Sequence, residues 1–343
     1  MNKKAVVFTF IVIALISVIL IAFLVNLSNR NIQSKIQDTN IRIETINSFT
    51  RTLNDDLIPQ AIKSSSNRAI LSWLTYLDFS NNVTTTLTPL TGEFITSSIP
   101  LNDNLKNAVV FENYDKDPLI RGDIVELKYM YDANGNTNYT LPSILKEIQT
   151  LAFNSGLNFT YDDPQNYEYQ ITQISPWEIN VSVKVTNYKI SDMKGEVFWN
   201  FENKVYYTIL NVTNFVDPFM LVLDNKTINI NSTGFIPGST GTFTDQNFQL
   251  FYTRPEFIAD DDAPSFLKRL QGDSSSDANG IETVLNPTYF PNTPGYSNVD
   301  YLYWTHVDGC LLVQPADMYL DAAHVSYYNR QTNEPGCVIV SET

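Results

Sequence analysis

Cysteine and histidine are the scarcest reactive residues of this 343-residue chain, which contains two of each. The four side chains (His306, Cys310, His324 and Cys337) are not spaced as the tight ligand pairs that usually bind structural zinc. The chain also lacks a Gly-x-Ser-x-Gly sequence, and no serine or cysteine stands beside a plausible base. We therefore predict no catalytic residues, no cofactor and no metal ion, and we expect a protein that is not an enzyme.

Charged residues are few as well, at 17% of the chain against roughly 25% in typical soluble domains. Acidic residues outnumber basic ones by 37 to 22, which gives a formal net charge of −15. A chain with this charge is repelled by nucleic-acid phosphates and by anionic membrane surfaces. The composition excludes nucleic acid as a partner, and the uncharged polar surface that remains is typical of an exported protein.

Both cysteines, Cys310 and Cys337, lie in the last tenth of the chain. In an exported protein an even number indicates a disulfide, which here would close a loop of about 26 residues and stabilise the fold by roughly 3 kcal/mol. The alternative is a pair of unrelated buried thiols. We expect the disulfide, and with it a small disulfide-closed C-terminal α+β region.

The longest apolar run, Ala5 to Val25, contains no charged residue, glycine or proline. At a rise of about 1.5 Å per residue, a helix of this length spans the roughly 30 Å hydrocarbon core of a bilayer. Lys3 and Lys4 precede it, so the positive-inside rule predicts a cytoplasmic N-terminus and an extracellular remainder. A cleaved signal peptide is the alternative, but its apolar core is shorter and ends in small residues. We expect a single-pass cell-membrane anchor whose partner is the lipid bilayer.

Helical periodicity continues beyond the anchor, with apolar residues three, four or seven positions apart. These residues are Ile32, Ile36, Ile43, Ile46, Leu53 and Leu57. Pro59 is expected to end or kink this helix at Ile58. A second helical segment, Gln60 to Leu77, is expected to bury Ala69, Ile70, Trp73, Leu74 and Leu77. The first helix is either a stalk that associates with other copies or an amphipathic helix packed on its own domain.

The rest of the chain predicts an α+β fold. Leu141 to Ala152 reads as a short helix whose apolar face is Ile144, Leu145, Ile148 and Leu151. The period then changes to two, which indicates strands at 167–174, 177–188 and 196–212 joined by short turns. Such strands form an antiparallel meander with one face against helices. The predicted architecture is an N-terminal transmembrane helix that continues into a long amphipathic helix, followed by an antiparallel β-sheet ectodomain.

Four segments follow from these patterns: a transmembrane anchor (1–30), an amphipathic helical stalk (31–79), an antiparallel sheet ectodomain (80–256) and a C-terminal domain (257–343). Asn-x-Ser/Thr sequons, the acceptors of N-glycosylation, stop before the C-terminal domain. Besides Asn26 beside the anchor, the glycosylation candidates are Asn82, Asn138, Asn158, Asn180, Asn211, Asn225 and Asn231.

The C-terminal domain begins with Asp260-Asp261-Asp262, after which a short helix is expected at Pro264 to Leu270. The acidic cluster lacks the alternating oxygen ligands of a calcium loop and is interpreted as a solvated turn. Asp321 and His324 would be neighbours on a helix, a geometry that serves an ordinary hydrogen bond as well as a metal ion. The aromatic residues between Tyr289 and Tyr319 would either line a carbohydrate-binding face or fill a compact core.

Several short motifs are spread over most of the chain. They are Lys3-Lys4 with Phe8-Thr9-Phe10-Ile11, Ile43, Asn47-Ser48-Phe49, Asp55-Asp56, Arg68-Ala69-Ile70, Asp217-Pro218, Ala263 to Gly272, Gly280-Ile281-Glu282, Val299 to Tyr303, and Asp321-Ala322-Ala323-His324. Together they resemble a family of archaeal membrane-anchored surface proteins with a type IV pilin-like N-terminal helix. The resemblance implies an exported surface protein, associated with pili, and it supplies no catalytic residues.

One departure from the pilin pattern bears on the role. Type IV pilins are processed beside a residue, commonly glycine, just before the apolar run, whereas the first glycine here is Gly92. We therefore expect a permanently anchored protein with a structural, adhesive or pilus-accessory role, whose partners are surface or pilus proteins or further copies of itself. The alternatives are a pilin-like subunit of a surface filament and a sugar- or metal-binding ectodomain.

Overall fold

The computed structural model describes residues 3–83, 101–111, 113–115, 124–126, 139–224, 228–232, 248–249, 251, 253–254, 256–286, 295–305, 308–309, 311–313 and 318–328. Cys310, Cys337 and His306 lie outside these ranges, so the predicted disulfide falls on residues that are not described. The side chains of residues 3–19 are likewise outside the described part.

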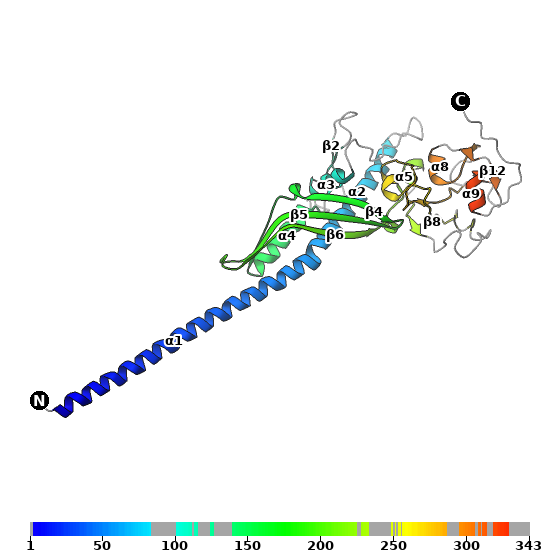
Figure 1. Cartoon of the computed structure of the whole chain (residues 1–343). Helices are drawn as coiled ribbons and strands as arrows, with labels where there is room; N and C mark the ends of the chain where they lie inside the picture. The colour runs from blue at the N-terminus through cyan, green and yellow to red at the C-terminus, as the bar shows by residue number, and fades with distance from the viewer. Residues whose placement is uncertain are drawn as a thin grey trace. The chain divides into compact units, whose positions relative to one another are not determined.

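The described helices are distributed along the whole chain (Figure 1). They are α1 (Lys3–Thr52), η1 (Leu53–Leu57), α2 (Ile58–Val83), α3 (Leu101–Lys106), η2 (Asn107–Phe111), α4 (Leu141–Asn154), η4 (Pro164–Asn166), η5 (Val212–Asn214), α5 (Pro218–Asp224), α7 (Phe266–Leu270), α8 (Asp300–Trp304) and α9 (Ala322–Tyr327). Together with the strands they make the fold α+β, as the sequence predicts.

The strands are short except for β4, β5 and β6. They are β1 (Asn113–Asp115), β2 (Ile124–Glu126), β3 (Leu157–Tyr161), β4 (Glu168–Ser175), β5 (Glu178–Asp192), β6 (Phe198–Asn211), β7 (Asn231–Ser232), β8 (Glu256–Ala259), β9 (Ile281–Glu282), β10 (Gly295–Tyr296), β11 (Asp308–Gly309), β12 (Leu311–Val313) and β13 (Met318–Leu320). The three strands predicted from period-two patterns are confirmed as β4, β5 and β6.

The main sheet is built around β5, which pairs with β3, β4 and β6. Strand β4 pairs antiparallel with the first half of β5, and β3 pairs antiparallel with its last five residues. The predicted antiparallel meander is therefore confirmed, with β3 as a strand that the sequence patterns did not reveal. Two smaller pairings build a three-stranded sheet of order β7-β8-β9, in which β7 and β8 run parallel.

The chain divides into two compact units, each made of three separate segments. The first unit contains residues 1–57, 147–161 and 187–202, and the second contains residues 58–146, 162–186 and 203–343. Each unit is therefore built from segments that do not follow one another in the sequence. Helix α4 and the long strands β5 and β6 contribute residues to both.

Pro59 changes the type of the helix instead of ending it. Helix α1 passes into the π-helical turn η1 and then directly into α2, in which Pro59 is the second residue. A proline inside a helix has no N–H to donate, and its ring crowds the carbonyl four residues earlier, here that of Asp55. Asp55 lies within the π-helical turn η1, so the backbone is irregular at this carbonyl.

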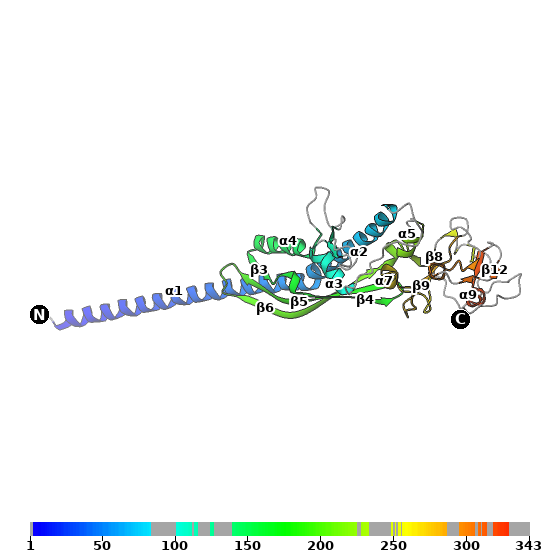
Figure 2. The same ribbon diagram turned by 90° about the horizontal axis from the view of Figure 1, so that it is seen from above.

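In the first unit, the C-terminal part of α1 runs along the strands (Figures 1 and 2). The Trp199 indole N–H donates to Asn47 Oδ1 at 3.0 Å, and the Tyr188 hydroxyl donates to Asn54 Oδ1 at 2.5 Å. Both asparagines lie on α1 or its π-helical continuation. These hydrogen bonds join the helix to the sheet. They agree with the interpretation in which this part of the helix packs on its own domain.

The predicted apolar stripe is buried where the helix reaches the sheet. Ile46 and Leu53 are fully buried, and Ile43 and Leu57 are half-buried. Ile36 is 55% exposed in the single chain, and the side chain of Ile32 lies outside the described residues. Heptad spacing alone cannot show where along a helix a neighbouring element begins.

The backbone of the apolar run Ala5 to Val25 is helical throughout, as part of α1. Among the residues that the structure describes, no helix combines the length and the apolar character needed to cross a bilayer.

The apolar face of α4 differs from the predicted face at its last residue, and Ile144 is half-buried. Leu145 and Ile148 are buried, but Leu151 is 53% exposed and Ala152 is fully buried in its place. The buried positions are spaced by four, three and four from Leu141, which keeps them on one side of a 3.6-residue helix. Leu151 and Ala152 lie three and four residues after Ile148, so helical spacing alone does not decide which of them is buried.

In the second unit, α2 supplies the first part of the core. Every residue predicted to be buried on it is buried: Ala69, Ile70, Trp73, Leu74 and Leu77. Helix α2 packs against α5, and the short helix expected before Leu270 is confirmed as α7.

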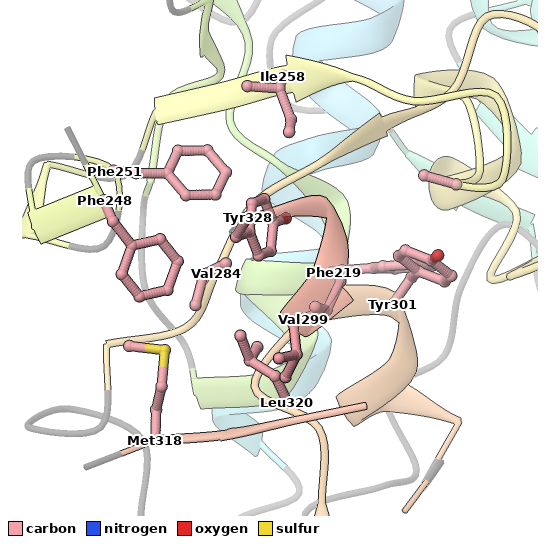
Figure 3. Close-up of a cluster of buried hydrophobic side chains, with 12 residues drawn as sticks. Phe219, Phe248, Phe251, Ile258, Val284, Val299, Tyr301, Met318, Leu320 and Tyr328 are labelled. Atoms are coloured by element: carbon pink, nitrogen blue, oxygen red, sulfur yellow. The ribbon is translucent and has the colours of Figure 1, made fainter. Parts of the chain in front are cut away.

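A second cluster of buried side chains lies in the C-terminal part of this unit (Figure 3). It contains Phe219, Phe248, Phe251, Ile258, Ala263, Val284, Val299, Tyr301, Met318, Leu320, Val325 and Tyr328. Tyr328 lies near the middle of the labelled side chains, with its ring 5.5 Å from that of Phe248 and 5.7 Å from that of Phe251. Tyr301 therefore fills a compact core, as one of the two interpretations of the aromatic residues predicts.

Candidate functional site

Two groups of buried charged side chains adjoin this aromatic core. The first, the arginine cluster, consists of Arg269 on α7 with Asp217 and Asp300. Arg269 Nη1 donates to Asp300 Oδ2 at 2.6 Å and to Asp217 Oδ2 at 3.2 Å. Its Nε donates to the Pro264 carbonyl at 3.3 Å, and its Nη2 donates to the Ile281 carbonyl. All three charged side chains are fully buried, so the guanidinium joins α5, α7, α8 and β9 inside the protein.

Local sequence places both carboxylates at helix beginnings. Asp217 precedes Pro218, the first residue of α5, and its carbonyl accepts from the Leu221 N–H at 3.2 Å. Asp300 is the first residue of α8, and its Oδ1 accepts from the Tyr301 N–H at 2.8 Å. Acidic residues stabilise helix N-termini, so each carboxylate serves a helix as well as the arginine.

The arginine cluster holds two carboxylates for one guanidinium, and this imbalance affects the ionisation of Asp217. Burial raises the pKa of Asp217 to about 6, against the lowering effect of Arg269 and with a further increase from Asp300. The fold thus favours the protonated form of this carboxyl. The raised pKa of Asp217 contributes its full stabilisation of the fold at pH values below the unfolded-state pKa, near 3.8. This stabilisation is lost as the pH rises through the folded-state pKa of about 6.

Replacing Asp217 by Asn should reduce this pH dependence. Between pH 5 and pH 7 the wild-type free energy of unfolding should fall by about 1 kcal/mol more than that of Asp217→Asn, because the amide does not titrate. Denaturant unfolding at the two pH values measures the difference. Asp262→Asn, which changes an exposed carboxylate, should keep the wild-type dependence; equal pH dependence in wild type and Asp217→Asn would contradict the assignment.

The second group, the histidine cluster, consists of Asp260, Glu282, Asp321 and His324. His324 Nδ1 lies 2.7 Å from Asp321 Oδ2, and its Nε2 lies 3.0 Å from Glu282 Oε2. The other oxygen of Glu282, Oε1, accepts from the Tyr328 hydroxyl. Glu282 is fully buried and His324 is 7% exposed. The imidazole is therefore held by a carboxylate at each nitrogen.

The start of α9 fixes the pair that the sequence singled out. Asp321 is the N-cap of α9, and its Oδ1 accepts from the N–H groups of Ala323 and His324, each at 3.1 Å. The same carboxylate contacts the His324 ring three residues along the chain. The hydrogen-bond interpretation of this spacing is confirmed.

The carboxylates also control the ionisation of the cluster. Burial lowers the pKa of His324, but the hydrogen bonds and charges of Asp321 and Glu282 outweigh it and raise the pKa to about 10. Burial raises the pKa of Glu282, although His324 and Tyr328 partly oppose this. Without another cation, His324 is the positive partner of its carboxylates at neutral pH.

Asp260 reaches the cluster through a close approach between two backbones. Its N–H donates to the Gly280 carbonyl at 3.0 Å, and its Oδ1 accepts from the Asp262 N–H at 2.8 Å. Asp261 and Asp262 are exposed, whereas Asp260 is half-buried. The acidic turn is thus solvated at two of its three residues and directed into the protein at the third.

Replacing Gly280 by Ala should disrupt this approach. An added Cβ would lie 2.0 Å from the Ala263 carbonyl oxygen and 2.2 Å from that of Asp260, and both are backbone atoms that cannot rotate away. We expect the free energy of unfolding to fall by at least about 2 kcal/mol, as for a severe overpacking change.

Gly156→Ala is the matched control, because its Cβ would enter open space and only its φ of +77° opposes it. That change should cost about 1–2 kcal/mol. Thermal unfolding of the two variants makes the comparison, and a Gly280→Ala protein as stable as Gly156→Ala would refute the close approach.

Asp260, Glu282 and His324 are the acidic or histidine side chains that converge most tightly in the described part of the chain. They offer one donor atom each, and these atoms lie within 4.8 Å of one another. The three side chains come from the turn after β8, from β9 and from α9, so only folding brings them together.

The predicted glycosylation sites fall on several elements. Asn158, Asn211 and Asn231 are exposed, on β3, at the end of β6 and on β7, and Asn180 on β5 is half-buried. Asn138, Asn225 and the side chain of Asn82 lie outside the described residues.

Sequence reasoning missed the roles of Arg269, Glu282, Asp217 and Asp300. All four stand inside the short motifs on which the archaeal resemblance rests, and each has at least one apolar neighbour in the sequence. The motifs did not reveal which of these charged side chains contact one another in the folded protein.

Comparison with protein-family models, curated protein sequences and solved structures found no match to this chain. The proposals below accordingly rest on the residues of the chain itself.

Proposed function

We propose that this chain is a single-pass membrane-anchored protein without catalytic activity, whose extracytoplasmic part makes structural, adhesive or pilus-accessory contacts. The first part of α1 would be the anchor, with the N-terminus in the cytoplasm. The remaining residues would then lie outside the cell, where a Cys310–Cys337 disulfide and glycosylation of the sequons are expected.

The exposed apolar surface of α1 carries the proposal. Its large apolar side chains between residues 20 and 27 are between 43% and 62% exposed: Leu20, Ile21, Phe23, Leu24, Val25 and Leu27. Asn26 is the one polar residue among these eight, and the seven apolar residues are spread over every side of the helix. An apolar surface of this kind requires cover, and a helix that is apolar all round is typical of a membrane span.

The solvent-facing side of β6 supports a contact role for the exported part. Val205, Tyr207 and Ile209 alternate with buried residues and are 53%, 70% and 46% exposed. Among the described strands, β6 pairs with β5 alone. Exposed apolar patches are favoured contact surfaces.

The second candidate is a pilin-like subunit of a surface filament. The same uncovered apolar part of α1 favours it, because copies of the helix could cover one another in a filament core in place of lipid. The absence of a glycine before the apolar run favours the permanent anchor. Surface filaments purified free of this protein would exclude the filament role.

Protease treatment of intact cells tests the proposed topology. We expect residues beyond α1 to be digested while a short N-terminal fragment remains with the membrane. A chain that survives on intact cells but is digested after lysis would contradict an extracytoplasmic location.

A further inference from the structure

We propose that Asp260, Glu282 and His324 bind a divalent transition-metal cation of the Zn²⁺ or Mn²⁺ class. The inference is independent of the membrane anchor, because every residue involved belongs to the second unit.

The separation of the donor atoms fits a shared cation. Bonds of about 2.0–2.2 Å from nitrogen and oxygen to zinc place two ligands of one ion about 3.0–3.5 Å apart. His324 Nε2 and Glu282 Oε2 are 3.0 Å apart, and the donor atom of Asp260 completes a group within 4.8 Å. Asp260 stands on a half-buried turn, where the Asp262 N–H holds its Oδ1 at 2.8 Å.

The groups behind these ligands are those of a metal centre. Metal-binding histidines usually donate their second ring N–H to a carboxylate, which fixes the tautomer and aims the free nitrogen. Asp321 Oδ2 occupies this place at 2.7 Å from His324 Nδ1. The Tyr328 hydroxyl similarly holds Glu282 Oε1, so Oε2 is left to face the cation. Both ligands are therefore preoriented before an ion arrives.

The composition of the cluster favours a cation. Three carboxylates, those of Asp260, Glu282 and Asp321, surround one imidazole, that of His324. None of the ion pairs to these groups in the described part of the chain comes from lysine or arginine. A divalent ion among these carboxylates would offset their negative charge in a largely buried place, where unbalanced charge is costly.

The donor types select the class of ion. Ca²⁺ and Mg²⁺ prefer oxygen ligands alone, whereas imidazole with carboxylates suits Zn²⁺, Mn²⁺ and similar ions. Three protein ligands leave at least one position for water, as in open zinc sites.

Calorimetry on the full chain in detergent, after treatment with a chelator, tests the site. We expect one saturable site per chain for Zn²⁺ or Mn²⁺ and markedly weaker binding of Ca²⁺. Asp260→Asn should weaken binding at least tenfold while its amide oxygen still accepts from the Asp262 N–H, and Asp261→Asn should bind as the wild type does.

Three results would overturn the proposal. They are the absence of saturable Zn²⁺ or Mn²⁺ binding by the folded wild type, tighter binding of Ca²⁺ than of either ion, and equal affinity in the two variants. The last result would assign binding to other residues. Circular dichroism of each variant serves as the control that the fold is intact.

Discussion

Replacing Arg269 by Met is expected to lower the free energy of unfolding by about 3–5 kcal/mol. The change removes the guanidinium that pairs with two fully buried carboxylates, those of Asp217 and Asp300. It also removes donors to the carbonyls of Pro264 and Ile281 and a cation–π contact with Phe219 at 4.9 Å. Breaking one side of a buried ion pair is costly because the remaining charge cannot be hydrated. Chemical denaturation measures the loss.

Two further variants isolate the charge effect. Lys268→Met changes the neighbouring residue, which is 27% exposed and lies beside surface groups, and should cost less than about 1 kcal/mol. The triple variant Arg269→Met, Asp217→Asn and Asp300→Asn carries no buried charge in the cluster and should recover part of the loss. If Arg269→Met is as stable as Lys268→Met, the arginine cluster does not stabilise the fold.

Replacing Trp73 by Ala is expected to cost about 3–5 kcal/mol, the usual range for removing a buried tryptophan. Trp73 is fully buried on α2 and is the largest of the fully buried side chains. The loss combines the transfer of its apolar surface with a cavity between α2 and its neighbours, one of which is α5. Thermal and chemical unfolding of the variant give the value.

Trp73→Phe is the matched control. Within the described structure the Trp73 indole N–H has no hydrogen-bond partner, so phenylalanine loses no hydrogen bond and leaves a smaller cavity. We expect it to cost less than half as much as Trp73→Ala. If both variants lose the same free energy of unfolding, the packing of an aromatic ring is not what Trp73 contributes to stability.

The sequence predicted those parts of the fold that depend on local periodicity. Trp73 and its neighbours on α2 were identified from helical spacing, and β4, β5 and β6 were identified from strict alternation. Strand β3, only five residues long, has too few alternations to be recognised. Leu151 was assigned to the core because large apolar residues are usually buried, but the tertiary contact falls on Ala152 instead.

The candidate site could be predicted only in part. Asp321 and His324 are near each other in sequence, so their contact follows from helix geometry. Glu282 lies 42 residues from His324, and Asp217 lies 52 from Arg269. Such pairs depend on the folded arrangement of several elements, and no local pattern specifies them. The presence of charged residues within the short motifs was the available signal.

N-terminal sequencing of the native protein, combined with its cellular fraction, tests the central claim most directly. The proposed anchor predicts a chain in the membrane fraction whose N-terminus lies before Ala5, so that the apolar run is retained. A soluble chain that begins after the apolar run Ala5–Val25 would contradict it, because the segment proposed as the anchor would then have been removed.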